Sequence, residues 1–83
     1  MTKLEKLLAR FESGLSLSFL ELQSILAVYG FRLDRVSGSH HIYVHPAVSR
    51  PISIQPDGKA AKRYQVKQLR AIISEFSLVM GSQ

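Results

Sequence analysis

Three histidines lie within six residues of this chain, and they are the side chains best suited to moving a proton. His40, His41 and His45 belong to the segment Gly38-Ser39-His40-His41-Ile42-Tyr43-Val44-His45. Imidazole exchanges protons near neutral pH. Because Gly38-Ser39 predicts a tight turn, His40 is expected at the beginning of a strand, where a substrate can reach it. His40 is therefore the candidate catalytic residue.

The same window does not predict a metal site. His41 and His45 share one face of the expected strand, but they lie about 13 Å apart at the usual rise. Ligands of one zinc ion bind at about 2 Å. His40 points to the opposite face, and no acidic cluster lies nearby. The chain has no cysteine, which excludes disulfides and thiolate metal ligands. We therefore expect chemistry without a metal or another cofactor.

Positive charge accompanies the histidines. The net charge of the chain is +5. Residues 1–31 carry equal numbers of basic and acidic side chains, whereas residues 32–70 carry eight Lys or Arg and two Asp. A positive field of this kind attracts nucleic acid, anionic membrane surfaces or acidic proteins. A solvated surface that keeps the protein in solution is the alternative.

The last predicted helix arranges part of this charge as a stripe. Arg63, Lys67 and Arg70 recur at i, i+4 and i+7, so they share one helix face. Lys59 and Lys62 extend the positive field into the preceding loop. Since Lys and Arg bind phosphate groups, these five side chains are expected to bind a phosphodiester substrate beside the histidines.

Helices and strands that position these residues follow from local motifs. Thr2 to Glu5 and Ser18 to Glu21 are capping boxes. Together with apolar residues at helical spacing, they predict helices over residues 2–12 and 18–29, with glycines after each. Alternating residues predict strands at 31–36, 40–45 and 52–55. Residues 46–50 are expected to be a loop, 56–58 a turn, and 63–76 a last helix.

This order predicts one α+β domain over residues 1–83 with a three-stranded antiparallel sheet. The second and last helices are the natural cover for one face. His40 has the strand parity of Ile42 and Val44, so it is expected to lean toward the covered side. No apolar run approaches the length of a membrane span, and the N-terminus lacks a signal-peptide pattern. We expect a cytoplasmic protein.

The motifs resemble the HicA toxins of bacterial HicA–HicB toxin–antitoxin systems. The resemblance rests on Gly38-Ser39-His40-His41-Ile42-Tyr43, on Ile52-Ser53-Ile54-Gln55, and on the segment from Gly58-Lys59 to Leu69. It covers roughly residues 16–76, so residues 1–14 form an additional N-terminal helix. The resemblance implies a double-stranded-RNA-binding-domain-like fold, with mRNA interferase activity that inhibits translation and growth. It also implies His40 as the catalytic residue and a HicB-type antitoxin as the partner.

In such a reaction a neutral imidazole at His40 takes the proton of an RNA 2′-hydroxyl, and the oxygen attacks the adjacent phosphate. His41, Tyr43, Lys59 and water are the candidates that give the leaving oxygen its proton. Many family members carry a further histidine just after the third strand, where this chain has Gln55-Pro56-Asp57. A mechanism that uses that histidine does not carry over.

Two other classes of protein fit the same residues. A double-stranded-RNA-binding module without chemistry needs the lysines but has no use for a histidine beside the groove. An inactive relative that only binds an acidic antitoxin would also carry the positive charge of residues 32–70.

Overall fold

Two capped helices open the chain. The structure is a computed structural model that describes residues 2–81. Helix α1 spans Lys3–Ser13 and α2 spans Phe19–Val28. The hydroxyls of Thr2 and Ser18 accept hydrogen bonds from the backbone N–H groups of Glu5 and Glu21, respectively. The side chain of each glutamate in turn accepts a hydrogen bond from the backbone N–H of its capping residue. Both predicted capping boxes are confirmed, and the glycines that follow the two helices adopt a positive φ.

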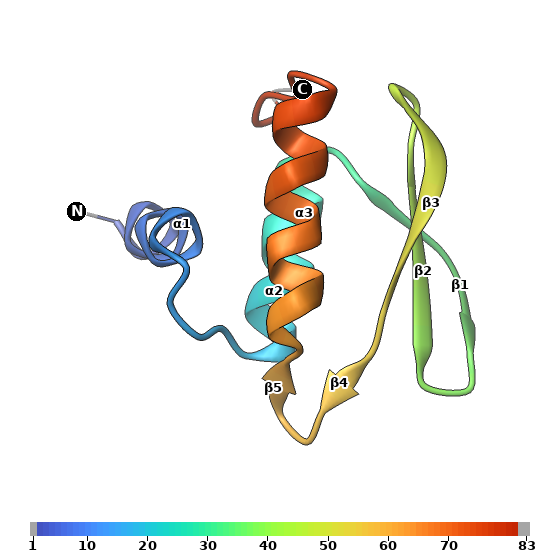
Figure 1. Cartoon of the computed structure of the whole chain (residues 1–83), viewed down its shortest axis with the longest axis horizontal. Helices are drawn as coiled ribbons and strands as arrows, with labels where there is room; N and C mark the ends of the chain where they lie inside the picture. Colours follow the sequence, from blue (N-terminus) through green and yellow to red (C-terminus); the bar gives the residue numbers. More distant parts are fainter. Residues whose placement is uncertain (1, 82–83) are drawn as a thin grey trace.

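A three-stranded antiparallel sheet follows. Its strands are β1 (Arg32–Ser37), β2 (His40–His45) and β3 (Val48–Ile54), in the order β1-β2-β3. A small hairpin, β4 (Pro56–Asp57) and β5 (Ala60–Ala61), leads into α3 (Arg63–Glu75). Figure 1 shows this α+β arrangement. The α+β class is as the sequence predicted, and the element order is consistent with the double-stranded-RNA-binding-domain-like fold that the family resemblance implied.

The third strand begins earlier than expected. Residues 48–50 were predicted to be a loop, but they belong to β3, which pairs with β2, and only Pro46 and Ala47 join the two strands. Pro51 therefore lies inside β3. An edge strand tolerates proline because one side of its backbone has no ladder partner. The expected turn at 56–58 is part of the β4–β5 hairpin, in which Pro56 pairs with Ala61.

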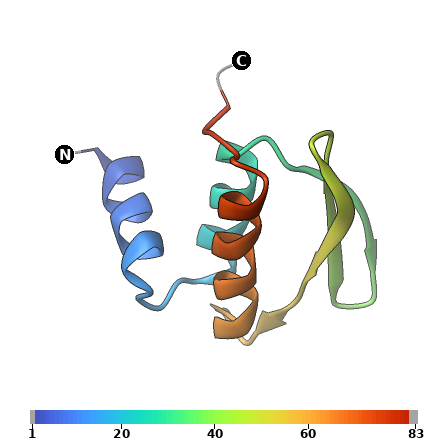
Figure 2. The same cartoon turned by 45° about the horizontal axis from the view of Figure 1, so that its top comes forward.

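The elements form three layers. Figures 1 and 2 show α1 in one layer, α2 and α3 in the next, and the three-stranded sheet beyond them. The helices cover the face of the sheet that carries Tyr43, Ile52 and Ile54, all of which are buried. This inner face meets the apolar sides of α2 and α3. The fully buried side chains on those two helices include Leu22, Ile25, Leu26 and Leu69.

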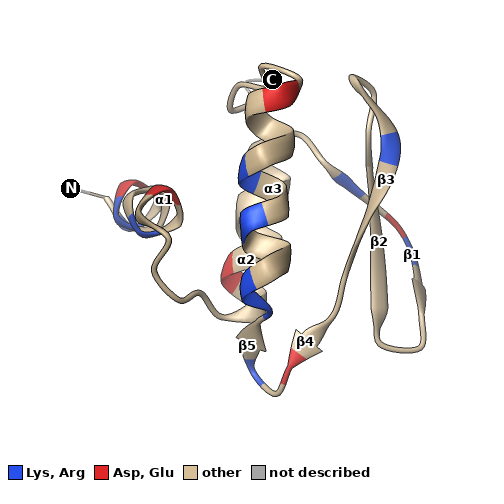
Figure 3. Cartoon of the chain, in the orientation of Figure 1, with Lys and Arg blue, Asp and Glu red and all other residues tan. Residues whose placement is uncertain are grey.

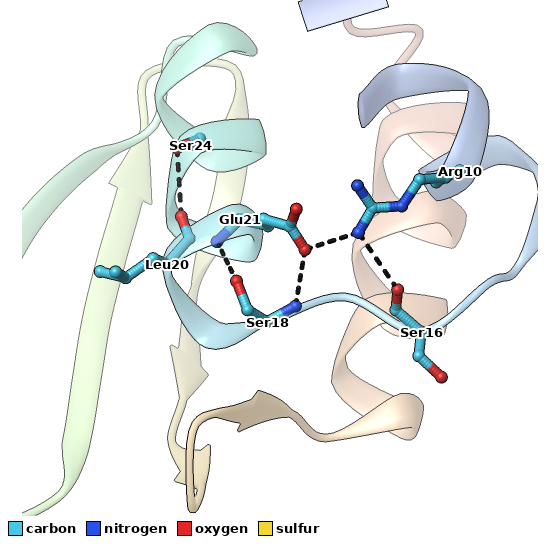
Figure 4. A network of polar contacts seen from close by, with 6 residues as sticks. All are labelled: Arg10, Ser16, Ser18, Leu20, Glu21 and Ser24. Atoms are coloured by element: carbon cyan, nitrogen blue, oxygen red, sulfur yellow. Dashed lines mark hydrogen bonds and ion pairs between the residues drawn. The ribbon is translucent and has the colours of Figure 1, made fainter. Parts of the chain in front are cut away.

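Helix α1 completes the core from the opposite side. Phe11 is completely buried. The guanidinium of Arg70 lies 5.8 Å from the centre of the Phe11 ring, and it donates a hydrogen bond of 3.0 Å to the Phe11 carbonyl. Helix α1 also contacts α2: the Arg10 guanidinium lies 2.7 Å from the Glu21 carboxylate, which also accepts the backbone N–H of Ser18 (Figure 4). The extra helix is therefore packed against the rest of the domain.

One end of the molecule gathers several chain segments. The β1–β2 turn, the β4–β5 turn and the start of α3 all lie at this end (Figure 1). Backbone hydrogen bonds of 2.9 Å tie the start of α2 to the same place, from Phe19 to the Lys59 carbonyl and from Ala61 to the Leu17 carbonyl. His40 and His41 begin β2 here, so the sequence motif and the β4–β5 turn share one end of the domain.

Candidate active site

His40 lies on the outer face of the sheet. It is exposed, and it pairs with Ser37 across the ladder. The expected lean toward the helices was wrong, because the residues of the opposite parity face α2 and α3, and Tyr43 is the one of them that is buried. Both faces of β2 carry apolar residues, so alternation alone did not decide which face is buried. The outward position leaves the imidazole open to a substrate.

A serine on the neighbouring strand contacts this imidazole. His40 Nδ1 lies 3.2 Å from the hydroxyl oxygen of Ser53. A hydroxyl can accept the Nδ1 proton, and Nε2 then keeps a free lone pair. In that tautomer the exposed ring has one nitrogen fixed by the protein and the other available as a base.

His41 points the opposite way, toward the helices. Its ring meets Phe19 edge-on, with 4.9 Å between the ring centres. Nδ1 lies 3.1 Å from the Ser39 carbonyl oxygen, and it must donate because a carbonyl only accepts. The side chain lines a hollow of about 650 Å³ between α2, β2 and the β4–β5 hairpin. We call this hollow the His41 pocket; its walls include Phe19, Leu20, Gln23, His41, Pro56 and Lys59.

Tyr43 and His45 take part in packing rather than in an exposed site. Tyr43 is buried, and its hydroxyl accepts a hydrogen bond of 3.1 Å from the Gln23 amide. His45 lies at the far end of β2, where its ring packs on Phe31 at 4.9 Å and Nδ1 accepts the Ala47 N–H. Tyr43 is therefore on the other side of the sheet from His40, and it is not a direct partner of that imidazole.

The stripe on α3 does not lie beside His40. Arg63, Lys67 and Arg70 line a hollow of about 300 Å³ together with the α1–α2 connection. Figure 3 shows the basic segments on successive turns of α3, in the layer between α1 and the sheet. Lys67 and Arg70 line this hollow and not the His41 pocket, so their binding of RNA stays a prediction. Lys59 alone among the five expected cations lines the His41 pocket.

Positive charge nevertheless continues from Lys59 to the start of α3. Lys62 and Arg63 line a third hollow, of about 540 Å³, with Asp57 and Ala60. Within the described residues, no side-chain hydrogen bond caps this helix, and its first turn has no acidic residue. The free N–H groups of an uncapped helix start favour anions. The resulting electrostatics favour a polyanion at this end of the domain.

Two arginines on β1 share the outer face with His40, and the sequence reasoning missed them. Arg35 pairs with Ile42 and Arg32 pairs with Val44, and paired residues of adjacent strands lie on the same face. Arg35 also contacts Asp34 at 2.8 Å. The register shifts between Leu33 and Arg35, so simple alternation assigns these side chains wrongly. The sequence signal that could have identified Arg32 and Arg35 as site residues was their positive charge a few positions before the histidine motif.

Among residues 2–81, no three His, Cys, Asp or Glu side chains converge as a metal site would require. In the same part of the chain, no helix is both long enough and apolar enough to span a membrane.

Comparison with protein families identifies the chain. The family model described as HicA toxin of bacterial toxin-antitoxin matches residues 20–74, which is more than half of the chain. The chain belongs to the HicA toxin family. The match runs from α2 through most of α3 and includes both His40 and His41, whereas α1 lies outside it. No curated protein and no solved structure matches the chain.

Membership of the HicA family confirms the resemblance seen in the sequence. It gives this protein the role of a toxin in a bacterial toxin–antitoxin system, and it implies an antitoxin as partner. The HicA family is known for mRNA interferase activity.

Proposed function

We propose that this HicA toxin is a metal-independent endoribonuclease that cleaves mRNA, with His40 as the general base. The observation that carries the proposal is the exposed imidazole at the first residue of β2, with Nδ1 next to the Ser53 hydroxyl. An exposed histidine with one nitrogen engaged is suited to accept a proton from a bound substrate. A HicB-type antitoxin as the partner, and action in the cytoplasm, belong to the same proposal.

The proposed reaction uses the nucleophile that RNA itself carries. His40 Nε2 takes the proton of a 2′-hydroxyl, and O2′ attacks the adjacent phosphorus. The bond from phosphorus to O5′ breaks, which yields a 2′,3′-cyclic phosphate and a free 5′-hydroxyl. Arg35 on the same sheet face and Lys59 are the cations that would stabilise charge on the phosphate oxygens. His41, Lys59 or water returns a proton to O5′.

The remaining cations would bind nucleotides that flank the cleaved bond. Lys59, Lys62 and Arg63 form a series from the His41 pocket to the start of α3, and Lys67 and Arg70 continue it along the helix. Phosphate contacts of this kind supply affinity without sequence preference. A single strand that passes around this end of the domain would meet the histidines first and α3 afterwards.

The test compares two adjacent histidines that point to opposite faces. His40→Ala should lower the rate of RNA cleavage by about 10²- to 10⁴-fold, as expected for loss of a general base. It should also abolish growth arrest, while circular dichroism and the unfolding midpoint stay close to those of the wild type. His41→Ala is the matched control and should lose less activity. Assays contain EDTA, so that a metal-dependent contaminant does not contribute.

Three results would overturn the proposal. Cleavage by His40→Ala at nearly the wild-type rate removes His40 as the base. A larger loss with His41→Ala transfers the role to the inner face. A stable complex of wild-type protein with intact RNA in EDTA indicates a binding module without catalysis.

A further inference from the structure

The His41 pocket has the size and the wall chemistry of a ligand site. Its volume of about 650 Å³ falls within the range of about 300–1,000 Å³ that is usual for ligand pockets. Leu20 lines the pocket, and this residue is 75 % exposed. A single exposed leucine needs no explanation. Here, however, Phe19 and Pro56 extend the apolar wall, so a flat apolar group would find contacts on several sides.

Polar groups in the same pocket remain available. Nδ1 of His41 is occupied by the Ser39 carbonyl, whereas Nε2 has no hydrogen-bond partner among residues 2–81. The side-chain amide of Gln23 donates one N–H to the Tyr43 hydroxyl, and the amide oxygen of Gln23 stays available to accept a hydrogen bond from a ligand. Lys59 adds a positive charge, and it forms no salt bridge with any residue in the described range. The pocket thus combines an apolar wall, hydrogen-bonding groups and one cation.

This combination matches a nucleotide better than an acidic peptide. An unstacked base presents an apolar ring face and a polar edge, and its phosphate carries negative charge. A carboxylate-rich segment would instead need several cations in the walls, and Lys59 is the one Lys or Arg in the described range that lines this pocket. His40 is the preceding residue along β2 and points to the other face, so a strand that bends around the sheet end would reach both.

We propose that the His41 pocket holds one unstacked nucleobase of a single-stranded RNA, with Lys59 bound to its phosphate. The inference takes from the proposed function only that RNA is the ligand, and it does not depend on His40 as the base. It assigns the pocket to positioning: the held base fixes which phosphodiester bond reaches the outer face.

The test measures coupling between the pocket wall and one base. The probe is a short single-stranded RNA whose riboses are all 2′-O-methylated, so that binding is measured without cleavage. A second set of probes lacks the base at one position at a time. Each probe is titrated into the wild-type protein, Leu20→Ala and Leu33→Ala. Leu33 is an exposed apolar residue of β1 that does not line the pocket, so it serves as the matched control.

Leu20→Ala should weaken binding of the intact probe by about 10- to 150-fold, the loss expected when a leucine side chain that the base covers is removed. Leu33→Ala should bind as the wild type does. At one probe position, removal of the base should weaken binding to the wild type but add little in Leu20→Ala, because both changes remove the same contact.

Additive losses at every position, or equal affinities of Leu20→Ala and the wild type, would overturn the assignment of the pocket. So would a Leu20→Ala protein that binds RNA normally but no longer binds its antitoxin. If the pocket assignment fails while unmodified RNA is still cleaved through His40, the endoribonuclease proposal stands. If the coupling is observed but unmodified RNA is not cleaved, the pocket assignment stands and the endoribonuclease proposal fails.

Discussion

Replacement of Phe11 by alanine tests whether the helix outside the family match belongs to the core. Phe11 is fully buried, and Arg70 contacts both its ring and its carbonyl. Truncation of a buried phenylalanine costs about 3–5 kcal/mol of unfolding free energy. A domain of 83 residues is expected to have about 4–12 kcal/mol in total. Phe11→Ala should therefore remove a large share of the stability of the domain.

The assay is equilibrium unfolding in urea, followed by circular dichroism. The midpoint should fall while the slope with urea stays unchanged, as for a loss of stability without a change in compactness. In a thermal scan the midpoint should fall by about 12–40 °C, because each kcal/mol shifts a domain of this size by about 4–8 °C.

Leu4→Ala is the control on the same helix. Leu4 is 41 % exposed, so its loss should cost about 0.5 kcal/mol or less. A cost below about 1 kcal/mol for Phe11→Ala would refute the packing argument. Helix α1 would then be an appendage, and the core would end at α2 and α3.

Three further predictions concern separate features. Glu21 accepts hydrogen bonds from Arg10 and from the Ser18 backbone, and these lower the pKa of its carboxyl group. A lowered pKa stabilises the fold above the unfolded value of about 4.3, and this contribution is lost as the pH falls through the folded value. The stability advantage of the wild type over Glu21→Gln should therefore shrink in acid, measured as urea midpoints between about pH 3 and pH 7; a constant difference would show that the contacts do not act on the carboxylate. Gly38 has a φ of +61°, and a Cβ at this position would meet open space, so Gly38→Ala should cost about 1–2 kcal/mol from backbone strain alone; a neutral result in urea unfolding would mean that the turn adapts. Lys67→Ala should lower the slope of log K against log salt for RNA binding by about 0.7, and an unchanged slope would remove Lys67 from the RNA path.

The helices were predictable because their signals are local. The capping boxes at Thr2 and Ser18 form hydrogen bonds within three residues, so no knowledge of the tertiary structure is needed. The strands were harder, because pairing joins distant segments. Residues 48–50 carried no strand signal that outweighed the two prolines around them, and the pairing of β3 with β2 decides their conformation.

The candidate site was predictable in part. The Gly-Ser turn correctly placed His40 at the beginning of a strand. Which face of β2 is buried depends on how Tyr43 fits beneath the helices, and alternation gives no such information. The α3 stripe was assigned to the same site because its residues share one charge. In the structure Arg70 contacts Phe11 of α1, and the three stripe residues line a hollow with the α1–α2 connection. This placement depends on the order of the layers, which the sequence does not show.

All six residues of β1 are exposed, which has a consequence for motion at the histidine motif. The strand is held chiefly by its ladder to β2, with no apolar side chain buried in the interior. Segments with so little burial open at a lower free energy than the rest of a domain. The turn that carries the chain from β1 into His40 is therefore anchored firmly on one side only, and hydrogen exchange should be faster along β1 than along β3.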